Sequence, residues 1–517
     1  MIVEFEWDDL MSFLKGKVPR DALINAIDMM GTPVEEHNDE IVRIEVFPNR
    51  PDLLDAGGMG RALNGFLGFE AGYPAWRMAS DGIKCSVPES RQSLIRPFLS
   101  FAMVKALKLN EAAVKGMMQL QEKLHITLGR NRAKYSIGIY NADMIRMPVR
   151  YEEWKLDDIS FVPLEGSEEL SGRQILEETE KGRAYAHLLP EDRAPVLLDA
   201  SGKIISMPPI INAEFCKVDA NTTNLFIDST GTSPGTDDIV AIVATSLAER
   251  GGIIQPVSPG PLFLPKRMPI DYDRIRALLG LEMSNMQIDS FLNKMRIGAV
   301  GEATIPPYRI DITRQMDLAE DVAIAYGYDN FKFTLPKTKL FGRPLPSQVF
   351  YNEIRKLMVG FGFLEIRGFN LVSPLASAMA GGANIRVLNA KSSEYSVLRP
   401  SLLPGLYHLL LRNKDSEYPQ KIFEIGNVFT PEQKVRLAGF IAHSEAGFSE
   451  IKGIVDALHT MVAPDEELKW ASGSHPMFME GRTAVSDWGV YGELAPELSQ
   501  QVGMPVAGFE LKLETDL

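Results

Sequence analysis

Four acidic residues lie close together in the segment YRIDITRQMDLAEDVAIAYGY, residues 308–328. Asp317, Glu320 and Asp321 have i, i+3, i+4 spacing, so a helix places them on one face, and Asp311 lies just upstream, where a strand can end. Carboxylate oxygens are ligands that Mg²⁺ prefers, with water or a partner's ligands at its other positions. The same acids also suit a helix start, as a capping-box-like pair near the positive end of the helix dipole. From spacing alone this capping interpretation is favoured.

A second polar group surrounds a predicted hairpin, APVLLDASGKIISMPPI (194–210), and the predicted strand NLFID (224–228). Strand ends and a Pro-Pro bend would bring these residues to one sheet edge, where they can line a pocket. Ser, Asn and Asp are also common wherever strands stop, and from the residues alone this turn interpretation is favoured. The candidate pocket residues are Leu197, Ser206, Asn212, Glu214, Asp228 and Thr230.

A third candidate is the basic turn with Arg130, Arg132 and Lys134, which follows Lys123. Such a turn can contact nucleic-acid phosphates, although a solvated charged turn is the favoured interpretation. The chain has no Gly-x-Ser-x-Gly elbow, no Walker loop and no His-Glu-x-x-His motif, and its seven histidines are scattered. The motifs therefore indicate no familiar nucleophilic or zinc-dependent active site.

Composition limits the class of protein. The chain has 517 residues, enough for three or four domains at ~150 residues each. Its net charge of −14 argues against a general nucleic-acid coat protein but leaves room for a local phosphate-binding patch. Two cysteines, Cys85 and Cys216, predict neither a disulfide framework nor a zinc cluster. With no apolar run long enough for a membrane helix and no signal-peptide pattern, we expect a cytoplasmic protein without membrane partners.

Hydrophobic periodicity and breakers predict four regions and an α+β multidomain fold. Residues 1–75 have the pattern of an α/β unit, with a strand at 40–47, Asp52 as a helix cap, and a helix from about Gly58 to Leu67. A mixed region covers 76–260. Four prolines within 252–266 make that segment the best linker candidate. A small domain over 261–340 has two helices, short strands and a third helix, an order that permits a winged-helix-like unit. Residues 335–346 are the next predicted linker, and 341–517 suggest an antiparallel sheet with packed helices.

Eight segments, in order along nearly the whole chain, resemble the β subunit of phenylalanyl-tRNA synthetases in its short archaeal or eukaryotic-type form. They are IEVFPNRPDLLDAGGMGRALNGFLG, LQEKLHITLGRNRAKYSIGIYN, SMPPIINAEFCKVDANTTNLFIDSTGT, YRIDITRQMDLAEDVAIAYGYDNF, RVLNAKSSEYSVLRPSLLPGLYHLLLRN, KIFEIGNVF, HPMFMEGRTA and YGELAPEL. Extra domains of the longer bacterial β subunit are not matched, which favours the short form.

The resemblance reverses both earlier preferences. It implies that Asp311, Asp317, Glu320 and Asp321 bind Mg²⁺ near the interface with an α subunit. It also implies that region 76–260 is an editing, tRNA-binding domain that hydrolyses tRNA mischarged with tyrosine. In that domain Asp228 and Thr230 fall at catalytic positions, and Leu197 and Ser206 at substrate-binding ones. Ala213 stands where a serine is often found, which puts the strength of editing in question.

The last region resembles a class II synthetase core that has lost its chemistry. KIFEIG offers Phe423 and Glu424 without the expected arginine, and no arginine-bearing final motif appears near GFELKLE. We therefore expect the phenylalanine–tRNA ligase reaction to need an α subunit, in an (αβ)₂ heterotetramer in which α binds ATP and phenylalanine and the complex binds tRNA(Phe). Two alternatives stay open at this stage, a free-standing hydrolase of mischarged tRNA and a scaffold without editing activity.

Overall fold

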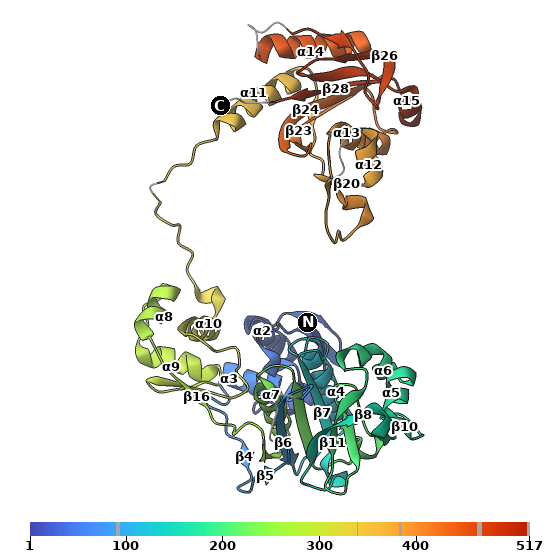
Figure 1. Cartoon of the computed structure of the whole chain (residues 1–517). Helices are drawn as coiled ribbons and strands as arrows, with labels where there is room; N and C mark the ends of the chain where they lie inside the picture. Colours follow the sequence, from blue (N-terminus) through green and yellow to red (C-terminus); the bar gives the residue numbers. More distant parts are fainter. Residues whose placement is uncertain (89–93, 339, 382–384, 463–467, 514–517) are drawn as a thin grey trace. The chain divides into compact units, whose positions relative to one another are not determined.

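The structure is a computed structural model that describes residues 1–517 except 89–93, 339, 382–384, 463–467 and 514–517. The chain forms two compact units, Met1–Thr334 and Leu335–Leu517, and each is described by itself (Figure 1). In the described ranges, no helix is both long enough and apolar enough to cross a lipid bilayer.

The first unit begins with a three-stranded antiparallel sheet, ordered β1-β3-β2, that carries three helices. The predicted strand at 40–47 is β3. The predicted cap Asp52 is wrong, because Asp52 pairs with Arg50 and the side chain of Asp55 accepts the capping hydrogen bond from the Gly58 N–H at 3.0 Å. The bounds are β1 Ile2–Glu6, α1 Trp7–Ser12, α2 Arg20–Met29, β2 Val34–His37, β3 Ile41–Glu45 and α3 Ala56–Phe66.

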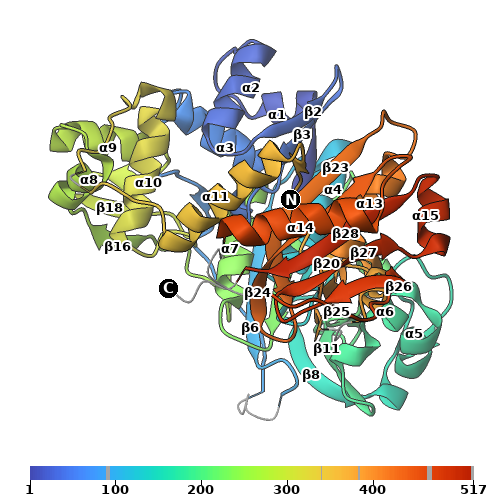
Figure 2. The same ribbon diagram turned by 90° about the horizontal axis from the view of Figure 1, so that it is seen from above.

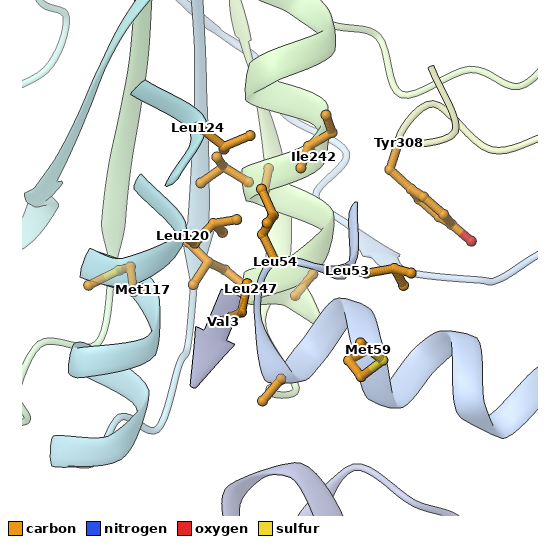
Figure 3. Packing of buried hydrophobic residues seen from close by; sticks show 14 of the residues in the cluster. Val3, Leu53, Leu54, Met59, Met117, Leu120, Leu124, Ile242, Leu247 and Tyr308 are labelled. Atoms are coloured by element: carbon orange, nitrogen blue, oxygen red, sulfur yellow. The ribbon is translucent and has the colours of Figure 1, made fainter. Parts of the chain in front are cut away.

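A six-stranded sheet forms the centre of this unit, in the order β4-β15-β6-β14-β7 with β5 also beside β15. Helices α4 and α7 contact this sheet and also pack on the N-terminal elements (Figure 3). One hydrophobic cluster therefore runs from Val3 to Ile254 and also contains Tyr308. The bounds are β4 Arg77–Met78, β5 Ile83–Lys84, β6 Phe98–Lys105, α4 Glu111–Ile126, β7 Tyr135–Asn141, β14 Leu225–Gly231, α7 Thr236–Ala248 and β15 Ile253–Ser258.

The linker predicted at 252–266 is wrong for its first half, because residues 253–258 form strand β15 inside this sheet. Proline lacks the N–H that a ladder needs, yet Pro256 is tolerated for a positional reason. Strand β4 pairs with Ile253 and Ile254, and β5 pairs with Val257 and Ser258. Pro256 lies in the gap between these two short strands, so neither of them requires its N–H.

A second, four-stranded sheet, β13-β12-β11-β8, lies across a hydrophobic cluster from the first. The predicted hairpin at 194–210 is present as β11 and β12. Strand alternation sends Phe226 of β14 into this cluster, whereas its neighbours Leu225 and Ile227 enter the central one. The bounds are β8 Arg150–Lys155, β9 Ser160–Phe161, β10 Leu170–Ser171, α5 Gly172–Glu178, α6 Glu180–Tyr185, β11 Arg193–Leu198, β12 Ile204–Met207 and β13 Ile211–Asn212.

Residues 266–326 have a core of their own. Three short strands in the order β16-β18-β17 accompany three helices, of which α10 contains Asp317, Glu320 and Asp321, with Asp311 just before it. The bounds are β16 Lys266–Pro269, α8 Tyr272–Leu279, α9 Asn285–Lys294, β17 Gly298–Ala299, β18 Glu302–Ile305 and α10 Gln315–Tyr326.

The second unit is built on a seven-stranded sheet ordered β19-β23-β24-β28-β27-β26-β25, antiparallel except for the β19–β23 pair. Helices α11 and α14 pack on one face and α13 and α15 on the other; Figure 2 shows α14 lying along its strands. The bounds are α11 Pro346–Gly360, β19 Leu364–Glu365, β20 Leu371–Val372, α12 Pro374–Met379, β21 Ile385–Arg386, β22 Val397–Leu398, α13 Leu403–Arg412, β23 Gln420–Phe429, β24 Gln433–Ala442, α14 Phe448–Val462, β25 Ala471–Ser472, β26 Phe478–Val485, β27 Gly489–Leu494, α15 Pro496–Val502 and β28 Val506–Lys512.

Candidate functional site

A pocket of about 610 Å³ opens between the two sheets of the first unit. Its wall includes residues of α4, β7, β12 and β13, together with the Pro208–Pro209 bend. Of the predicted residues, Ser206, Asn212 and Asp228 line it. Pockets of this size, mostly apolar with a few convergent polar groups, are typical of small-ligand sites.

Asp228 is the buried acidic group of this pocket, with 1% of its surface exposed, whereas Glu165 and Glu180 also line it but are exposed. The Tyr140 hydroxyl donates to Asp228 Oδ1 at 2.5 Å and lies 2.9 Å from Ser206 Oγ. A phenol has one proton, so Tyr140 donates it to the carboxylate and accepts from the serine hydroxyl. Asp228 Oδ2 has no hydrogen-bond partner among the described residues. The arrangement leaves one carboxylate oxygen buried at the pocket wall without a hydrogen-bond partner.

Burial raises the pKa of Asp228 to about 7, although the Tyr140 hydrogen bond and the nearby Arg96 guanidinium act to lower it. Burial also raises the pKa of Tyr140 well above its usual range, so Tyr140 stays a neutral donor. A carboxylate that titrates near neutral pH suits general-base catalysis, because it is both partly ionised and basic enough to take a proton from water.

Thr230 and Leu197 do not line the pocket, in contrast to the prediction. The Thr230 side chain is fully buried, and Arg96 donates to its Oγ1 from Nε at 3.0 Å and to its carbonyl oxygen from Nη2 at 2.8 Å. Leu197 is fully buried in the hydrophobic cluster between the sheets. The sequence patterns place both residues on strands, as observed. They give no sign that the Thr230 hydroxyl accepts a hydrogen bond from Arg96.

Glu214 is occupied as well. Its Oε2 accepts from the Glu165 N–H at 2.6 Å, and its Oε1 lies 3.7 Å from Lys217 Nζ. Glu214 therefore fixes a loop at the edge of the pocket, as the turn interpretation proposed. Lys217 and Lys181 are exposed and line the opening together with Glu165 and Glu180, so the rim carries charges of both signs, which the sequence analysis did not single out.

The basic turn at 130–134 divides between two roles. Arg130 is exposed, whereas Arg132 is 8% exposed and donates from Nη1 to the carbonyl oxygens of Pro209 at 3.1 Å and Ile210 at 2.8 Å. Arg132 thus supports the Pro208–Pro209 bend and is not free to contact phosphate. Nearby, His125 Nε2 accepts from the Ile137 N–H at 2.9 Å, so a neutral His125 has its proton on Nδ1.

The acidic segment forms a different arrangement from the one predicted. Arg309, with 3% of its surface exposed, donates to Asp311 Oδ2 and Asp321 Oδ2, each at 2.8 Å. Asp317 Oδ2 instead accepts from the backbone N–H groups of Thr313 at 2.7 Å and Arg314 at 2.8 Å. Glu320 is exposed at the first turns of α10.

These four carboxylates do not fit a magnesium ion as they stand. Over the described ranges, no three or more His, Cys, Asp or Glu residues are grouped so that they can hold a metal. Arg309 already neutralises two of the four acids. Burial, which raises the pKa of Asp317, is outweighed by the N–H groups of Thr313 and Arg314, so that pKa lies below its usual value. Asp317 is thus a helix-capping carboxylate, the interpretation that spacing alone favoured.

Arg309 belongs to a buried charged cluster that joins the acidic segment to the N-terminal elements. Arg50 pairs with Asp52 at 2.9 Å, and the guanidinium of Arg61 lies 3.6 Å from the centre of the Tyr308 ring. The charge of Arg309 lowers the pKa of Asp52, although burial opposes it and Arg50 has the larger lowering effect. This cluster connects segments that are about 250 residues apart in the sequence.

Comparison with known proteins identifies the family. Residues 332–513 match the family described as "Phenylalanyl tRNA synthetase beta chain CLM domain", and residues 268–328 match "tRNA synthetase B5 domain". The chain is 38% identical over 547 aligned residues to the phenylalanine–tRNA ligase β subunit of Archaeoglobus fulgidus, covering 99% of this chain and 98% of that one.

The chain belongs to the phenylalanyl-tRNA synthetase β-subunit family. The β subunit of Methanothrix thermoacetophila is 36% identical, with 99% of each chain covered. A crystal structure of an N-terminal fragment of the phenylalanyl-tRNA synthetase β subunit from Pyrococcus horikoshii matches with a TM-score of 0.59 and 32% identity. It covers 63% of this chain and 99% of that fragment. The resemblance seen in the sequence is therefore confirmed, and the fold is a mixed α/β multidomain one.

Proposed function

We propose that this β subunit acts with an α subunit to attach phenylalanine to tRNA(Phe), and that its own reaction is the hydrolysis of tyrosine from mischarged tRNA(Phe). The observation that carries the second part is the buried Asp228, with one free carboxylate oxygen on a 610 Å³ pocket and a pKa of about 7. The exposed Lys181 and Lys217 at the opening suit the phosphates of a tRNA acceptor end.

In this proposal Asp228 Oδ2 takes a proton from the water that attacks the ester carbonyl carbon. The bond between that carbon and the tRNA 3′ or 2′ oxygen breaks, Asp228 returns its proton to that oxygen so that it leaves as a hydroxyl, and the tyrosine carboxyl group loses its proton to solvent. Ser206 orients the ester from beside Tyr140. Thr230 acts through Arg96, whose charge favours the ionised form of Asp228. Leu197 supports the strand opposite Ser206.

Hydrolysis at a second site answers a selectivity problem. A pocket made for phenylalanine rejects an added hydroxyl by only about 10²-fold, whereas a site that hydrogen-bonds the hydroxyl selects tyrosine strongly. The direct test is deacylation of Tyr-tRNA by the α–β complex with Asp228→Ala. We expect tyrosine release to slow by about 10²-fold or more, with phenylalanine charging near the parent rate. The matched control is Asp157→Ala, which removes an exposed partner of Arg173. Parent-like deacylation by Asp228→Ala would exclude the pocket.

The part of the proposal that concerns assembly is an (αβ)₂ heterotetramer in which α binds ATP and phenylalanine. The proposal also includes the domain boundaries at 75, 260 and 340. It includes the winged-helix-like character of residues 261–340 and the class II synthetase-like character of residues 341–517. The sheet of the second unit, which carries helices on both faces, supports the synthetase-like interpretation. Its strand β23 lacks the arginine that would bind an ATP phosphate. The isolated chain should show no phenylalanine-dependent exchange between ATP and pyrophosphate, and exchange should appear when α is added.

Magnesium binding by Asp311, Asp317, Glu320 and Asp321 is a proposal that requires these carboxylates to leave the contacts described above. The donor types and their helical spacing favour it, and the capping of Asp317 and the Arg309 pairs oppose it. A free-standing hydrolase of mischarged tRNA is the second candidate function. Co-purification of this chain with an α subunit would contradict it.

A further inference from the structure

The second unit contains a pocket of about 370 Å³ far in sequence from the editing site. It lies between α11, the loop at 367–370 and strand β23. Its floor carries Glu424 and Arg399, and its sides include Tyr351, Phe369 and Val435. All of these residues belong to one unit, so the pocket does not depend on how the two units are arranged.

Glu424 is the unusual group of this pocket, because its side chain is only 1% exposed and yet incompletely paired. Arg399 Nη1 lies 2.8 Å from Oε1, but neither carboxylate oxygen has a well-oriented hydrogen bond among the described residues. Arg399 is directed partly elsewhere, since its Nε donates to the Asn427 carbonyl oxygen at 2.8 Å. Buried charges are normally fully hydrogen-bonded, so Glu424 has unused acceptor capacity at the wall of the pocket.

Two glycines let this ion pair pack directly against the backbone. A Cβ at Gly368 would lie 3.1 Å from Glu424 Oε2 and 3.2 Å from Arg399 Nη1. A Cβ at Gly426 would lie 2.5 Å from Arg399 Nη2 and 2.8 Å from Glu424 Oε1. Neither glycine has the positive φ that would explain it by backbone conformation. A side chain at either position would therefore crowd the two charged groups and displace them.

The same pocket has a free guanidinium at its mouth. Arg367 lines the pocket, is exposed, and has no partner among the described residues. The neighbouring Arg355 is already occupied, by Glu365 at 2.7 Å and Asn352 Oδ1 at 2.9 Å. Arg367 is therefore the group that can take an anion, and a guanidinium binds a carboxylate through two parallel hydrogen bonds.

We propose that this pocket binds a free α-amino acid. The ammonium group donates to Glu424 on the floor, the carboxylate pairs with Arg367 at the mouth, and the side chain lies against Tyr351, Phe369 and Val435. The site is separate from the editing pocket and does not rest on the proposed hydrolysis.

The experiment titrates each of the twenty L-amino acids into the full-length chain by calorimetry. At least one should bind with one-to-one stoichiometry, and its N-acetyl derivative, which lacks the ammonium charge, should bind at least 10-fold more weakly. Arg367→Gln and Gly368→Ala should each weaken binding at least 10-fold, as should Glu424→Gln. The first two variants change an exposed residue and a glycine, so the test holds even if Glu424→Gln does not fold.

Arg412→Gln is the matched control, since Arg412 is exposed in the same unit and does not line the pocket. Asp228→Ala controls for amino acids that enter the editing pocket. The proposal is overturned if no amino acid saturates the chain, if Arg367→Gln and Gly368→Ala bind like the parent, or if Asp228→Ala alone abolishes binding.

Discussion

Tyr140 on β7 and Asp228 on β14 share a hydrogen bond of 2.5 Å across two adjacent antiparallel strands. Directly opposite Asp228 in this pairing is Gly138. A side chain at Gly138 would overlap both the Tyr140 hydroxyl and Asp228 Oδ1. The glycine is thus needed for the tyrosine to reach the carboxylate over its own strand, and the pair is a product of sheet register.

Tyr140→Phe removes the donor to Asp228 and leaves the ring in place. This hydrogen bond lowers the pKa of Asp228, so its loss should move that pKa above about 7. We expect Tyr-tRNA deacylation at pH 7 to slow by about 10-fold, the equivalent of ~1.4 kcal/mol, with partial recovery at higher pH. A rate-against-pH profile of the α–β complex measures this. An unshifted profile would show that Tyr140 does not act on Asp228.

Asp228→Asn tests the cost of keeping this carboxylate. Because the folded-state pKa of about 7 exceeds the ordinary 3.8, the contribution of Asp228 to stability is most favourable below pH 3.8 and is lost as pH rises through about 7. Above pH 7 the penalty is at most about 4 kcal/mol. Asparagine stays neutral, so the variant should unfold at a higher temperature than the parent at pH 8, with the difference shrinking toward pH 4. It should also lose deacylation. A variant less stable than the parent at pH 8 contradicts this account.

The sequence predicted elements better than it predicted contacts. Hairpins and strands can be predicted from local sequence patterns. The predicted strand ends were therefore sufficient to place Ser206 and Asp228 at one sheet edge. Tyr140 and Arg96 escaped notice, since a tyrosine in an apolar strand and an arginine before one have ordinary structural explanations. Their roles arise from contacts between residues that are distant in sequence. Tyr140 and Asp228 are 88 residues apart, and Arg96 and Thr230 are 134 residues apart. The prediction of a linker around Pro256 was wrong for the opposite reason. Proline usually interrupts a strand, but Pro256 lies between the segments that pair with β4 and β5, where no N–H is needed.

The same distinction explains the acidic segment. Spacing correctly placed Asp317 at the start of a helix and indicated its capping role. The position of Arg309, two residues before Asp311, gave no sign that its guanidinium would turn toward both Asp311 and Asp321. A charge that neutralises two carboxylates is a tertiary feature, and the family resemblance by itself suggested a metal ion in that role.

Asp317→Ala with Glu320→Ala separates capping from metal binding. If Asp317 only caps α10, the double variant should lose about 1 kcal/mol of stability, and Glu320→Ala alone should lose little. Neither loss should depend on magnesium. The measurement is the unfolding temperature of chain and α–β complex with and without added Mg²⁺. A magnesium-dependent stabilisation present in the parent and absent in the double variant would establish the metal site instead.

Arg309→Ala should be among the most destabilising substitutions in the first unit. It leaves Asp311 and Asp321 without their shared partner, and removing one member of a buried ion pair costs about 3–5 kcal/mol. Denaturant unfolding of the full chain measures the loss. Arg274→Ala, at an exposed position of α8, is the control and should change stability little. Equal stability of the two variants would show that the buried pairs contribute nothing.

Thr230→Val distinguishes a positioning threonine from one that contacts substrate. Valine has nearly the same shape but lacks the hydroxyl that accepts from Arg96 Nε, while the Thr230 carbonyl oxygen still accepts from Nη2. With one of two anchors gone, Arg96 should favour the ionised form of Asp228 less, so the deacylation profile should move to higher pH and the rate at saturating pH should stay near the parent's. Thr230→Ser keeps the hydroxyl and should restore the parent profile. A threonine that held water or ester directly would instead lower the rate at every pH, because its loss removes a contact that no change of protonation replaces. Arg96 is almost wholly buried beside Thr230 and outside the pocket lining, so the profile shift is the result that the geometry requires.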